Sequence, residues 1–425
     1  MEDPNTAGIG SIDVDLDNQE ILLAASQHDV PKLRELIRSN QKEENPANVK
    51  DPETGYSPLH AAIAACEPET DNVTNGDTTE PATHEQESSP ETVDGGVKTV
   101  KFLLQEGAIW NDLDANDDTP GCLARRLGLQ ELYQLMVDAG VRAELLLNRL
   151  EGYEQLEDEE DEGEENVVNT TTEEEATETE KTEVEATTWC PETTTGETEE
   201  HNVQDPSVSN DNYLSSGLTF QESRLLDADK NGVMMAWETD IMEKSAKGLL
   251  PKPGLKVLNI GHGMGIVDGV IQSLEPSAHH IIEAHPAVIA DMKSKGWHEK
   301  TGVTIHEGKW QDILPKLAAD GVMFDAIYYD TFAESYADFR DFASEHVIAL
   351  LEPEGRWSFF NGMGADRQIS YDVYQKVVEM DMLEAGFDVD WTEIAVPSLD
   401  SEWDGVRRKY WVVDNYRLPM CTYLD

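Results

Sequence analysis

The sequence predicts an α/β protein, with a largely parallel, doubly wound sheet in its C-terminal half, a helical region before it and an acidic linker between them. Three observations carry this prediction. Apolar runs alternate with helical periodicity from about residue 213 onward, the N-terminal third shows helical periodicity only, and the stretch between them is strongly acidic. Because 425 residues exceed the usual size of one domain, we expect three regions, at 1–150, 151–212 and 213–425.

The N-terminal region begins with a predicted pair of helices at 19–39, broken at Asp29-Val30-Pro31. The stretch Ser57-Pro58-Leu59-His60 resembles the Thr-Pro-Leu-His signature of ankyrin repeats. In that signature the hydroxyl residue caps a helix and proline occupies the first turn. Thr119-Pro120 opens a second, weaker copy. A generic helical domain that carries one motif by chance is the alternative.

An insertion accounts for the spacing of the two copies. Pro58 and Pro120 are 62 residues apart, which is 29 more than the 33-residue ankyrin period. The polar stretch 67–95 is 29 residues long and has no apolar periodicity. We therefore predict a disordered insertion near 67–95, between the two helices of one repeat. Residues 97–108 then resemble the second helix of that repeat.

Residues 151–212 contain 23 acidic residues and one lysine, a net charge of −22 within a total of −56. Such a self-repelling, low-complexity stretch predicts a solvated linker. The overall charge argues against direct binding of nucleic acid or of an anionic membrane, and it is compatible with a basic protein partner. A role of the charge in solubility is the alternative explanation. No apolar run is long enough for a membrane span, and the N-terminus is unlike a signal peptide.

The cysteines show neither paired nor metal-ligand spacing. They are Cys66, Cys122, Cys190 and Cys421. Free thiols in a reducing compartment are the simplest interpretation, so we expect a protein of the cytoplasm and the nucleus. We further expect a monomer without a bound metal ion.

The C-terminal region alternates between strand and helix signals, which is typical of a parallel sheet with helices on both faces. The expected strands are 255–260, 279–284, 303–307, 324–330, 355–360, 388–396 and 409–414. Helices are expected between them, for example at 264–274, 286–294, 335–351 and 370–385.

The most informative motif is a glycine turn after the first of these strands. Residues 255–266 predict a buried strand, a Gly-x-Gly-x-Gly turn and a helix start, so backbone N–H groups can approach a ligand closely. A dinucleotide site would have its third glycine at Ile266, so the spacing favours a smaller group, such as the amino-acid end of S-adenosylmethionine. Glu283, 22 residues after Gly261, ends the next strand and can hold ribose hydroxyls. A turn that only packs a helix on the sheet is the alternative.

Further polar and aromatic residues fall at the ends of the expected strands. Parallel sheets bind ligands beyond these carboxyl ends, so the glycine turn, Glu283, Trp310-Gln311 and Asp330 should meet at one rim. Trp310 can stack on adenine, and Gln311 can bond its amine, although a core tryptophan is equally consistent. Asp330 should face the site, the alternative being a salt bridge to a loop.

An ordered series of motifs resembles guanidinoacetate N-methyltransferase over most of 213–425. The series is Met-x-x-Trp-Glu-Thr-x-x-Met from Met234, Gly-x-Gly-Met-x-Ile from Gly261, Ile-Ile-Glu at Glu283, Gly-x-Trp-x-Asp at Trp310 and Tyr-Asp-Thr at Asp330. With its ankyrin-like region and acidic linker, the whole chain is similar to the fungal type IV protein arginine methyltransferases. The resemblance implies a Rossmann-like domain that uses S-adenosylmethionine to methylate the internal (delta, N5) nitrogen of arginine in a protein, reportedly a ribosomal one.

The resemblance also implies the site residues. Glu238 and Asp330 match the carboxylates that hold the guanidino group. Tyr213 and Phe220 are expected to cover the cofactor. The other implied cofactor contacts are Met242, Gly261, His262, Gly263, Met264, Gly265, Ile266, Glu283, Ala284, His285, Trp310, Gln311 and Asp330. His285 stands where the small-molecule enzyme has asparagine.

The chemistry of arginine fits two carboxylates. A guanidinium is a rigid fork of five donors that stays protonated, and paired carboxylates can grip it and aim one nitrogen. Asp330 is the candidate base for the proton that this nitrogen must lose. Two alternatives remain: a methyltransferase of small guanidino compounds, and an ankyrin binding protein whose second half has lost catalysis.

Overall fold

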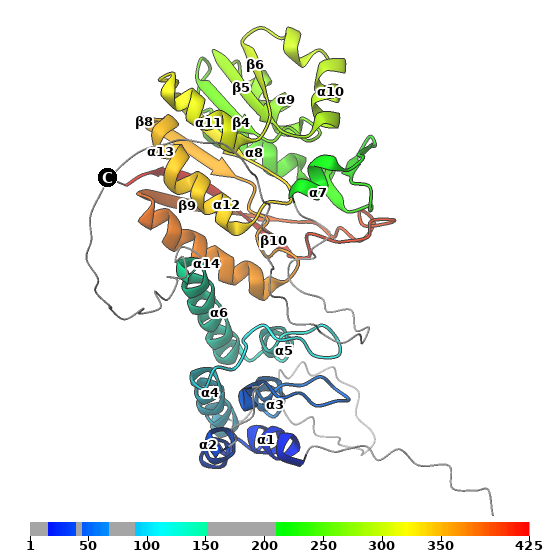
Figure 1. Ribbon diagram of the computed structural model, residues 1–425, viewed down its shortest axis with the longest axis vertical. Helices are drawn as coiled ribbons and strands as arrows, with labels where there is room; N and C mark the ends of the chain where they lie inside the picture. The colour runs from blue at the N-terminus through cyan, green and yellow to red at the C-terminus, as the bar shows by residue number, and fades with distance from the viewer. Residues whose placement is uncertain (1–15, 40–44, 68–89, 151–209, 425) are drawn as a thin grey trace, which may run out of the picture.

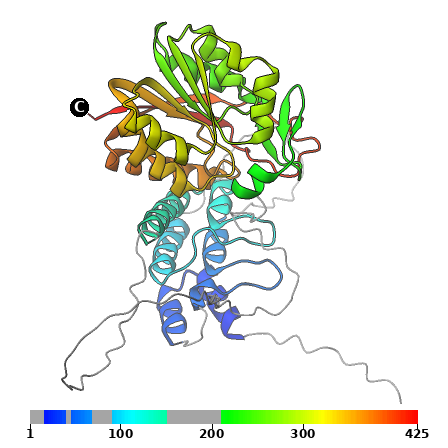
Figure 2. The same cartoon turned by 45° about the horizontal axis from the view of Figure 1, so that its top comes forward.

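The computed structural model describes residues 16–39, 45–67, 90–150 and 210–424 (Figure 1). Most of the predicted insertion and nearly all of the predicted linker lie outside these residues. Within them, two parts are evident: a stack of helices and an α/β domain above it (Figures 1 and 2). No helix in the described part of the chain is both long and apolar enough to cross a membrane.

The N-terminal part consists of three helix pairs. The helices are α1 (Leu16–Ser26), α2 (Val30–Ser39), α3 (Pro58–Ala64), α4 (Pro90–Gln105), α5 (Pro120–Arg126) and α6 (Gln130–Leu150), with a short 3₁₀ turn at Pro46–Asn48. Both motif copies start a helix, as their chemistry requires. The Ser57 hydroxyl lies 2.9 Å from Nδ1 of His60, and the Thr119 hydroxyl accepts from the amide of Cys122 at 3.2 Å. The relation of these pairs to ankyrin repeats stays a prediction.

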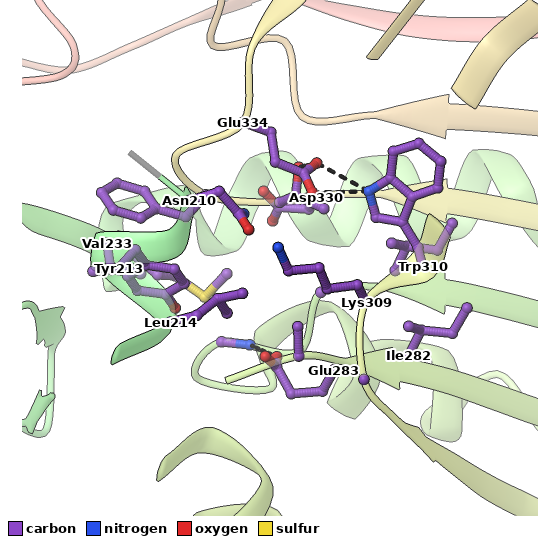
Figure 3. Close-up of a pocket in the computed structure, with 18 residues that line it drawn as sticks. Asn210, Tyr213, Leu214, Val233, Ile282, Glu283, Lys309, Trp310, Asp330 and Glu334 are labelled. Carbon is purple, nitrogen blue, oxygen red and sulfur yellow. Dashed lines mark hydrogen bonds between the residues drawn. The ribbon is translucent and has the colours of Figure 1, made fainter. Parts of the chain in front are cut away.

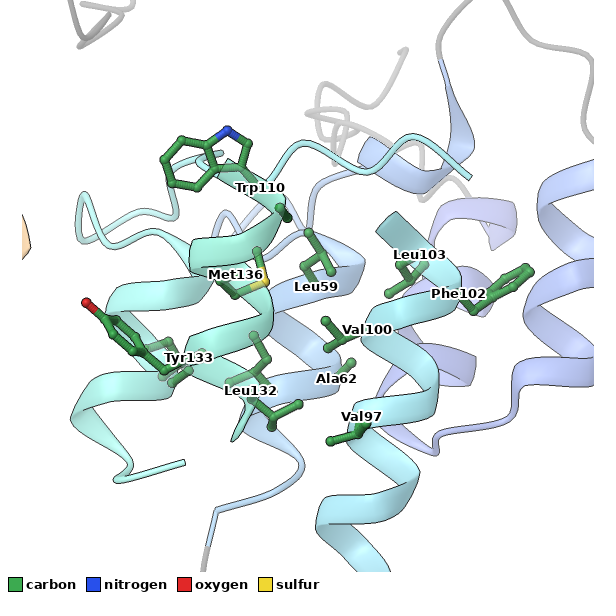
Figure 4. Packing of buried hydrophobic residues seen from close by; sticks show 14 of the residues in the cluster. Leu59, Ala62, Val97, Val100, Phe102, Leu103, Trp110, Leu132, Tyr133 and Met136 are labelled. Carbon is green, nitrogen blue, oxygen red and sulfur yellow. The ribbon is translucent and has the colours of Figure 1, made fainter. Parts of the chain in front are cut away.

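The boundary of the predicted insertion is wrong at its C-terminal end, because α4 begins at Pro90 and includes 90–95. The misleading signal is the Gly95-Gly96 pair, which suggests a loop. In the helix these glycines allow close packing: a Cβ on Gly96 would lie 2.4 Å from Sγ of Cys66. Leu59 of α3, Val100 of α4 and Met136 of α6 share the buried core of the stack (Figure 4).

The C-terminal part has a seven-stranded sheet in the order β6-β5-β4-β7-β8-β10-β9. Its strands are β4 (Lys256–Ile260), β5 (Ala278–Glu283), β6 (Val303–Glu307), β7 (Phe324–Tyr329), β8 (Leu351–Phe359), β9 (Phe387–Ala395) and β10 (Asn415–Tyr423). The pairs from β6 to β8 are parallel, and β10 is antiparallel to both of its neighbours. The chain leaves β4 in one direction and returns beside it as β7, so a crevice forms at the carboxyl ends of these two strands.

Helices cover both faces of this sheet (Figure 1). They are α8 (Thr239–Leu249), α9 (Ile266–Ser273), α10 (Pro286–Ser294), α11 (Trp310–Ala319), α12 (Tyr336–Asp341), α13 (Val347–Leu350) and α14 (Gln368–Glu384), with a π-helical turn at Phe342–His346 and 3₁₀ turns at Ala236–Glu238 and Trp297–Glu299. A small antiparallel sheet precedes them, with β1 (Thr219–Phe220), β2 (Arg224–Leu226) and β3 (Gly232–Met235). The Rossmann-like α/β prediction is thus confirmed, with a mixed sheet.

Two predicted boundaries in this part are wrong. The stretch 409–414 is not a strand, and the last strand starts at Asn415. Instead of pairing, Tyr410 and Trp411 pack their rings against Trp237, with ring centroids 6.1 and 5.5 Å apart. The predicted linker also ends too late, because a short helix, α7 (Asn210–Ser215), begins inside it.

The two parts of the chain share one interface on α14 (Figures 1 and 2). Ile369, Val373 and Val377 of α14 belong to the apolar core of the helical stack and are each at most 1% exposed. At the margin, the Tyr133 hydroxyl donates to Asp372 at 2.5 Å. The helical stack therefore completes the burial of a helix that belongs to the α/β domain.

Candidate functional site

The glycine turn joins the ends of three neighbouring strands. The amide of Gly261 donates to the carbonyl of Ile282, and the amide of Asp330 donates to that of Ile260, both at 2.9 Å. Gly261 has φ +90°, and a Cβ there would lie 1.8 Å from the carbonyl oxygen of Asp330. Only glycine fits this position, because any side chain would collide with backbone. The turn therefore fixes Asp330 beside the start of the glycine loop.

Glu283 holds the glycine loop through its carboxylate. One carboxylate oxygen accepts from the amide of His262 at 2.9 Å and of Gly263 at 3.4 Å, and the other accepts from the amide of His285 at 2.7 Å. Glu283 is 7% exposed and lines a cavity. A carboxylate oxygen has more than one acceptor position, so Glu283 can also accept from sugar hydroxyls that enter this cavity.

The first cavity lies beyond the carboxyl ends of β4, β5 and β7. Glu283 lies at one end, Asp330 and Glu334 at the other, and the Lys309 side chain projects between them (Figure 3). Helix α7 contributes a wall through Tyr213. Other lining residues include Asn210, Leu214, Met234, Gly261, Gly263, Ile282, Ala284 and Trp310.

Helix α7 is held over this cavity by contacts of Asp211 and Tyr213. Nζ of Lys309 donates to Asp211 at 2.9 Å, and Nε2 of His285 lies 3.1 Å from the carbonyl oxygen of Tyr213. The Tyr213 ring packs between those of His285 and Phe332, with centroids 4.8 and 4.9 Å apart. Tyr213 thus forms a wall of the cavity, and its role as a cover of the cofactor stays a prediction.

The structure brings part of the predicted cofactor set to this cavity. The predicted residues that line it are Tyr213, Gly261, Gly263, Glu283, Ala284, Trp310 and Asp330. They come from α7 and from four strand ends far apart in sequence. The expected convergence of these stretches on one rim is therefore observed.

The other predicted contacts do not line the cavity: Phe220, Met242, His262, Met264, Gly265, Ile266, His285 and Gln311. The Phe220 and Gln311 side chains are exposed, and Met242 is fully buried in the core beside β4. The His262 ring is buried beneath the loop, where Nδ1 lies 2.6 Å from Asp268. His285 caps α10 instead, with Nδ1 3.1 Å from the amide of Ala287.

The Trp310 side chain is fixed at the cavity by a hydrogen bond and by ring contacts. Its indole N–H donates to the two oxygens of Glu334 at 2.9 and 3.1 Å, and its ring packs against Phe342 with centroids 5.6 Å apart. The hydroxyls of Tyr329 and Thr331 donate to the same carboxylate. Trp310 is therefore both a core residue and a wall of the cavity, so the two interpretations of this tryptophan are compatible.

A second cavity adjoins the first and shares Asp330 and Glu334 with it. Its walls are rich in aromatic rings: Tyr329, Phe332, Tyr336, Phe339, Phe360, Tyr374 and Tyr410. Glu238, which is 3% exposed, lies at this cavity and accepts from the hydroxyl of Tyr410 and from the amide of Met235 at 3.3 Å. Both predicted guanidino-binding carboxylates therefore face one aromatic chamber.

Burial raises the pKa of both of these carboxyl groups. Desolvation, together with the negative charges of Asp268 and Glu283, raises the pKa of Asp330 to about 7. Desolvation, and then repulsion by Asp330, raises the pKa of Glu238 well above its usual value. One Asp330 oxygen, Oδ2, is buried without a hydrogen-bond partner. A permanent cation in the chamber would offset these costs.

Sequence reasoning missed several residues of the site. Glu334 follows the fourth strand in a loop of unremarkable composition, and Tyr410 lies in the stretch taken for a strand. Lys309 precedes the recognised tryptophan but has no motif of its own. Their roles depend on contacts across 24 to 172 positions in the chain, which no local pattern contains.

The lining of the first cavity is compatible with a nucleoside-bearing methyl donor. The first cavity combines a side-chain-free glycine loop, apolar walls from Ile282 and Met234, and the carboxylate of Glu283. Across the described residues, no group of three or more His, Cys, Asp or Glu side chains could hold a metal ion.

Comparison with known proteins gives consistent matches. The guanidinoacetate N-methyltransferase family model matches residues 218–415. "Protein arginine N-methyltransferase 2" of Aspergillus oryzae is 68% identical over all of both chains. The protein of that name from Emericella nidulans is 67% identical over 98% of this chain and 99% of its own. That of Neurospora crassa is 44% identical over 96% and 95%.

Proposed function

This chain belongs to the fungal protein arginine N-methyltransferase 2 family, and from that premise we propose that it methylates the internal (delta, N5) nitrogen of an arginine in a protein. S-adenosylmethionine is the proposed methyl donor. The observation that carries the proposal is the position of Asp330, which lines both cavities and faces Glu238 in the second. A group in the first cavity and a guanidinium in the second would meet at this residue.

The residues of the first cavity suit the methyl donor. Glu283 would accept hydrogen bonds from ribose hydroxyls, the glycine loop would leave room for the amino-acid end, and Ile282 and Trp310 would flank the base. When bound, the donor supplies an activated methyl group on a sulfonium. Tyr213 and α7 would exclude water from this cavity.

Glu238 and Asp330 would bind and orient the guanidinium. A positive charge beside them favours their ionised forms, so the raised pKa values should fall and protons should leave as the arginine binds. Ion pairs with a planar fork of donors fix its direction as well as its position. Alignment of the reacting atoms then contributes a large part of the rate acceleration.

Asp330 is the proposed base. The nitrogen that accepts a methyl group must lose a proton, and a carboxylate whose pKa lies near 7 is suited to receive it at neutral pH. Tyr410 would hold Glu238 in place through its hydroxyl. The choice of the internal nitrogen rests on the resemblance to type IV enzymes and not on a distance in this chain.

The proposed partner is a basic protein, and a ribosomal protein is our candidate. The net charge of −56 supports attraction of basic proteins and opposes direct binding of nucleic acid or of an anionic membrane. We keep the expectations of a monomer and of a location in cytoplasm and nucleus as parts of this proposal.

The test is to incubate the purified chain with labelled S-adenosylmethionine and a basic protein extract, and to fragment the labelled residue by mass spectrometry. Methyl on the internal arginine nitrogen supports the whole proposal. Methyl on a terminal nitrogen would contradict the regiochemistry alone. Label in guanidinoacetate but in no protein would replace the proposal with the small-molecule activity that the match at 218–415 suggests.

A further inference from the structure

One positively charged side chain in the wall of the second cavity has no role in the proposed reaction. Its lining includes four acidic residues, Glu238, Asp330, Glu334 and Asp366, and a single basic one, Arg408. A chamber that receives a guanidinium has no evident need for a cationic wall, because like charges repel. Arg408 therefore requires its own explanation.

Charge balance within the protein does not supply that explanation. The Arg408 side chain is partly buried, and among the described residues no hydrogen bond or ion pair of its guanidinium is found. Two of the four acids have other partners: Glu238 accepts from Tyr410, and Glu334 accepts from Trp310, Tyr329 and Thr331. Neither Asp330 nor Asp366 forms an ion pair with Arg408 in the described part of the chain. A partly buried arginine with five free donors is poised for a carboxylate from outside.

The position of Arg408 says which part of a substrate it would meet. Tyr410 and Arg408 are two residues apart and both line the chamber, so at most about 7 Å of backbone separates them. Tyr410 contacts Glu238 at the end that grips the guanidinium. Glu238 is 3% exposed whereas Arg408 is only partly buried, so Arg408 lies nearer to solvent, where the main chain of a bound arginine and its neighbours in sequence would pass.

We propose that Arg408 is a specificity residue that binds a carboxylate of the substrate, supplied by an acidic residue next to the methylated arginine. This inference rests on the proposed function. A basic protein would be attracted by the overall charge, and Arg408 would then select an arginine with an acidic neighbour. A free carboxylate on a small guanidino acid has the same chemistry and is the other source to be tested.

The experiment compares kcat/KM for short synthetic peptides that carry one arginine flanked by glutamate or by glutamine. With the native chain we expect the glutamate peptides to be preferred by about tenfold, the typical worth of one charge-assisted contact. Arg408→Glu should abolish or reverse this preference. Lys409→Glu is the matched control, because it makes the same charge change at an exposed neighbour that does not line the chamber.

Each outcome decides a different point. An equal preference in the native chain and in Arg408→Glu would overturn the inference, as would an equal loss in Lys409→Glu. If Arg408→Glu fails to fold, Arg408→Gln serves in its place. If guanidinoacetate is methylated but no peptide is, the proposed function fails. The carboxylate-binding role of Arg408 is then tested by comparing guanidinoacetate with its uncharged amide in the same variants.

Discussion

Tyr410 donates its hydroxyl hydrogen to Glu238, across 172 positions of the chain, at the wall of the aromatic chamber. The bond favours the ionised form of Glu238 and so opposes the effects of burial and of Asp330 on the pKa of Glu238. Tyr410→Phe should raise the pKa of Glu238 further. We expect about tenfold lower kcat/KM at neutral pH, with partial recovery as the pH rises, because a protonated Glu238 grips a guanidinium poorly.

The control for Tyr410 is Tyr423→Phe. This substitution also removes one hydrogen bond, from the Tyr423 hydroxyl to the carbonyl of Leu351 at 3.1 Å, but Tyr423 lines neither cavity. A pH–rate profile of each variant is the measurement. The same profile for Tyr410→Phe, Tyr423→Phe and the native chain would contradict the role of the Tyr410 hydroxyl.

Asp330→Asn should lower catalytic activity and raise the stability of the fold. As a base, Asp330 should give a kcat/KM that rises as the pH passes about 7, and the variant should lose on the order of 10²–10⁴-fold in kcat. The folded pKa of Asp330 lies above its usual 3.8, so the native state holds more protons between these values. Stability of the free protein therefore falls as the pH rises from about 4 to about 7, and the uncharged variant should be more stable at pH 8 by up to a few kcal/mol.

Urea unfolding at pH 5 and pH 8, beside single-turnover kinetics, tests both halves of this prediction. Asp325→Asn is the matched control, because Asp325 lies near the start of β7, the strand that Asp330 follows, and accepts from the amide of Lys256. The idea fails if Asp330→Asn is no more stable than the native chain at pH 8, or if it retains near-normal turnover.

The sequence predicts the parts of this site that are local, and not those that depend on packing. Gly261 and Glu283 could be found because a strand, a tight turn and the end of the next strand are separated by short, regular intervals. Asp330 could be found because it directly follows the apolar and aromatic run 326–329. Lys309 and Arg408 have no such signal, since each gains its place only when distant elements meet.

The same limit applies to the fold. The apolar periodicity of α14 predicts a helix, but it does not say that Val373 packs against the helical stack and not against the sheet alone. Likewise, the apolar and aromatic composition of 409–414 suits a strand. In the structure a loop packs the rings of Tyr410 and Trp411 against Trp237. Composition does not distinguish apolar residues packed by a loop from apolar residues packed by a strand.

Glu283→Gln should weaken the binding of S-adenosylmethionine by about 10- to 100-fold. The two carboxylate oxygens accept hydrogen bonds from three backbone amides. Glutamine has one accepting oxygen, and its NH₂ group can only donate, so at least one of these backbone amides would face another donor. Isothermal titration calorimetry measures the affinity. Glu307→Gln is the control, because Glu307 is the register partner of Glu283 on β6 and pairs with exposed Lys293. Equal affinities of both variants would argue against Glu283 as the ribose-side carboxylate.

Val373→Ala should destabilise the whole molecule through the interface on α14. Val373 is fully buried between the α/β domain and the helical stack, where Gly140 of α6 comes close enough that an added Cβ would lie 2.6 Å from it. Removing two buried methyl groups there should lower the free energy of unfolding by about 2 kcal/mol. Met380→Ala, on the same helix but 44% exposed, should change the free energy of unfolding little.

Because the helical stack and the catalytic domain share this core, we expect one cooperative urea transition that shifts as a unit. Two separate transitions, with the catalytic one unmoved by Val373→Ala, would show that the two parts fold independently.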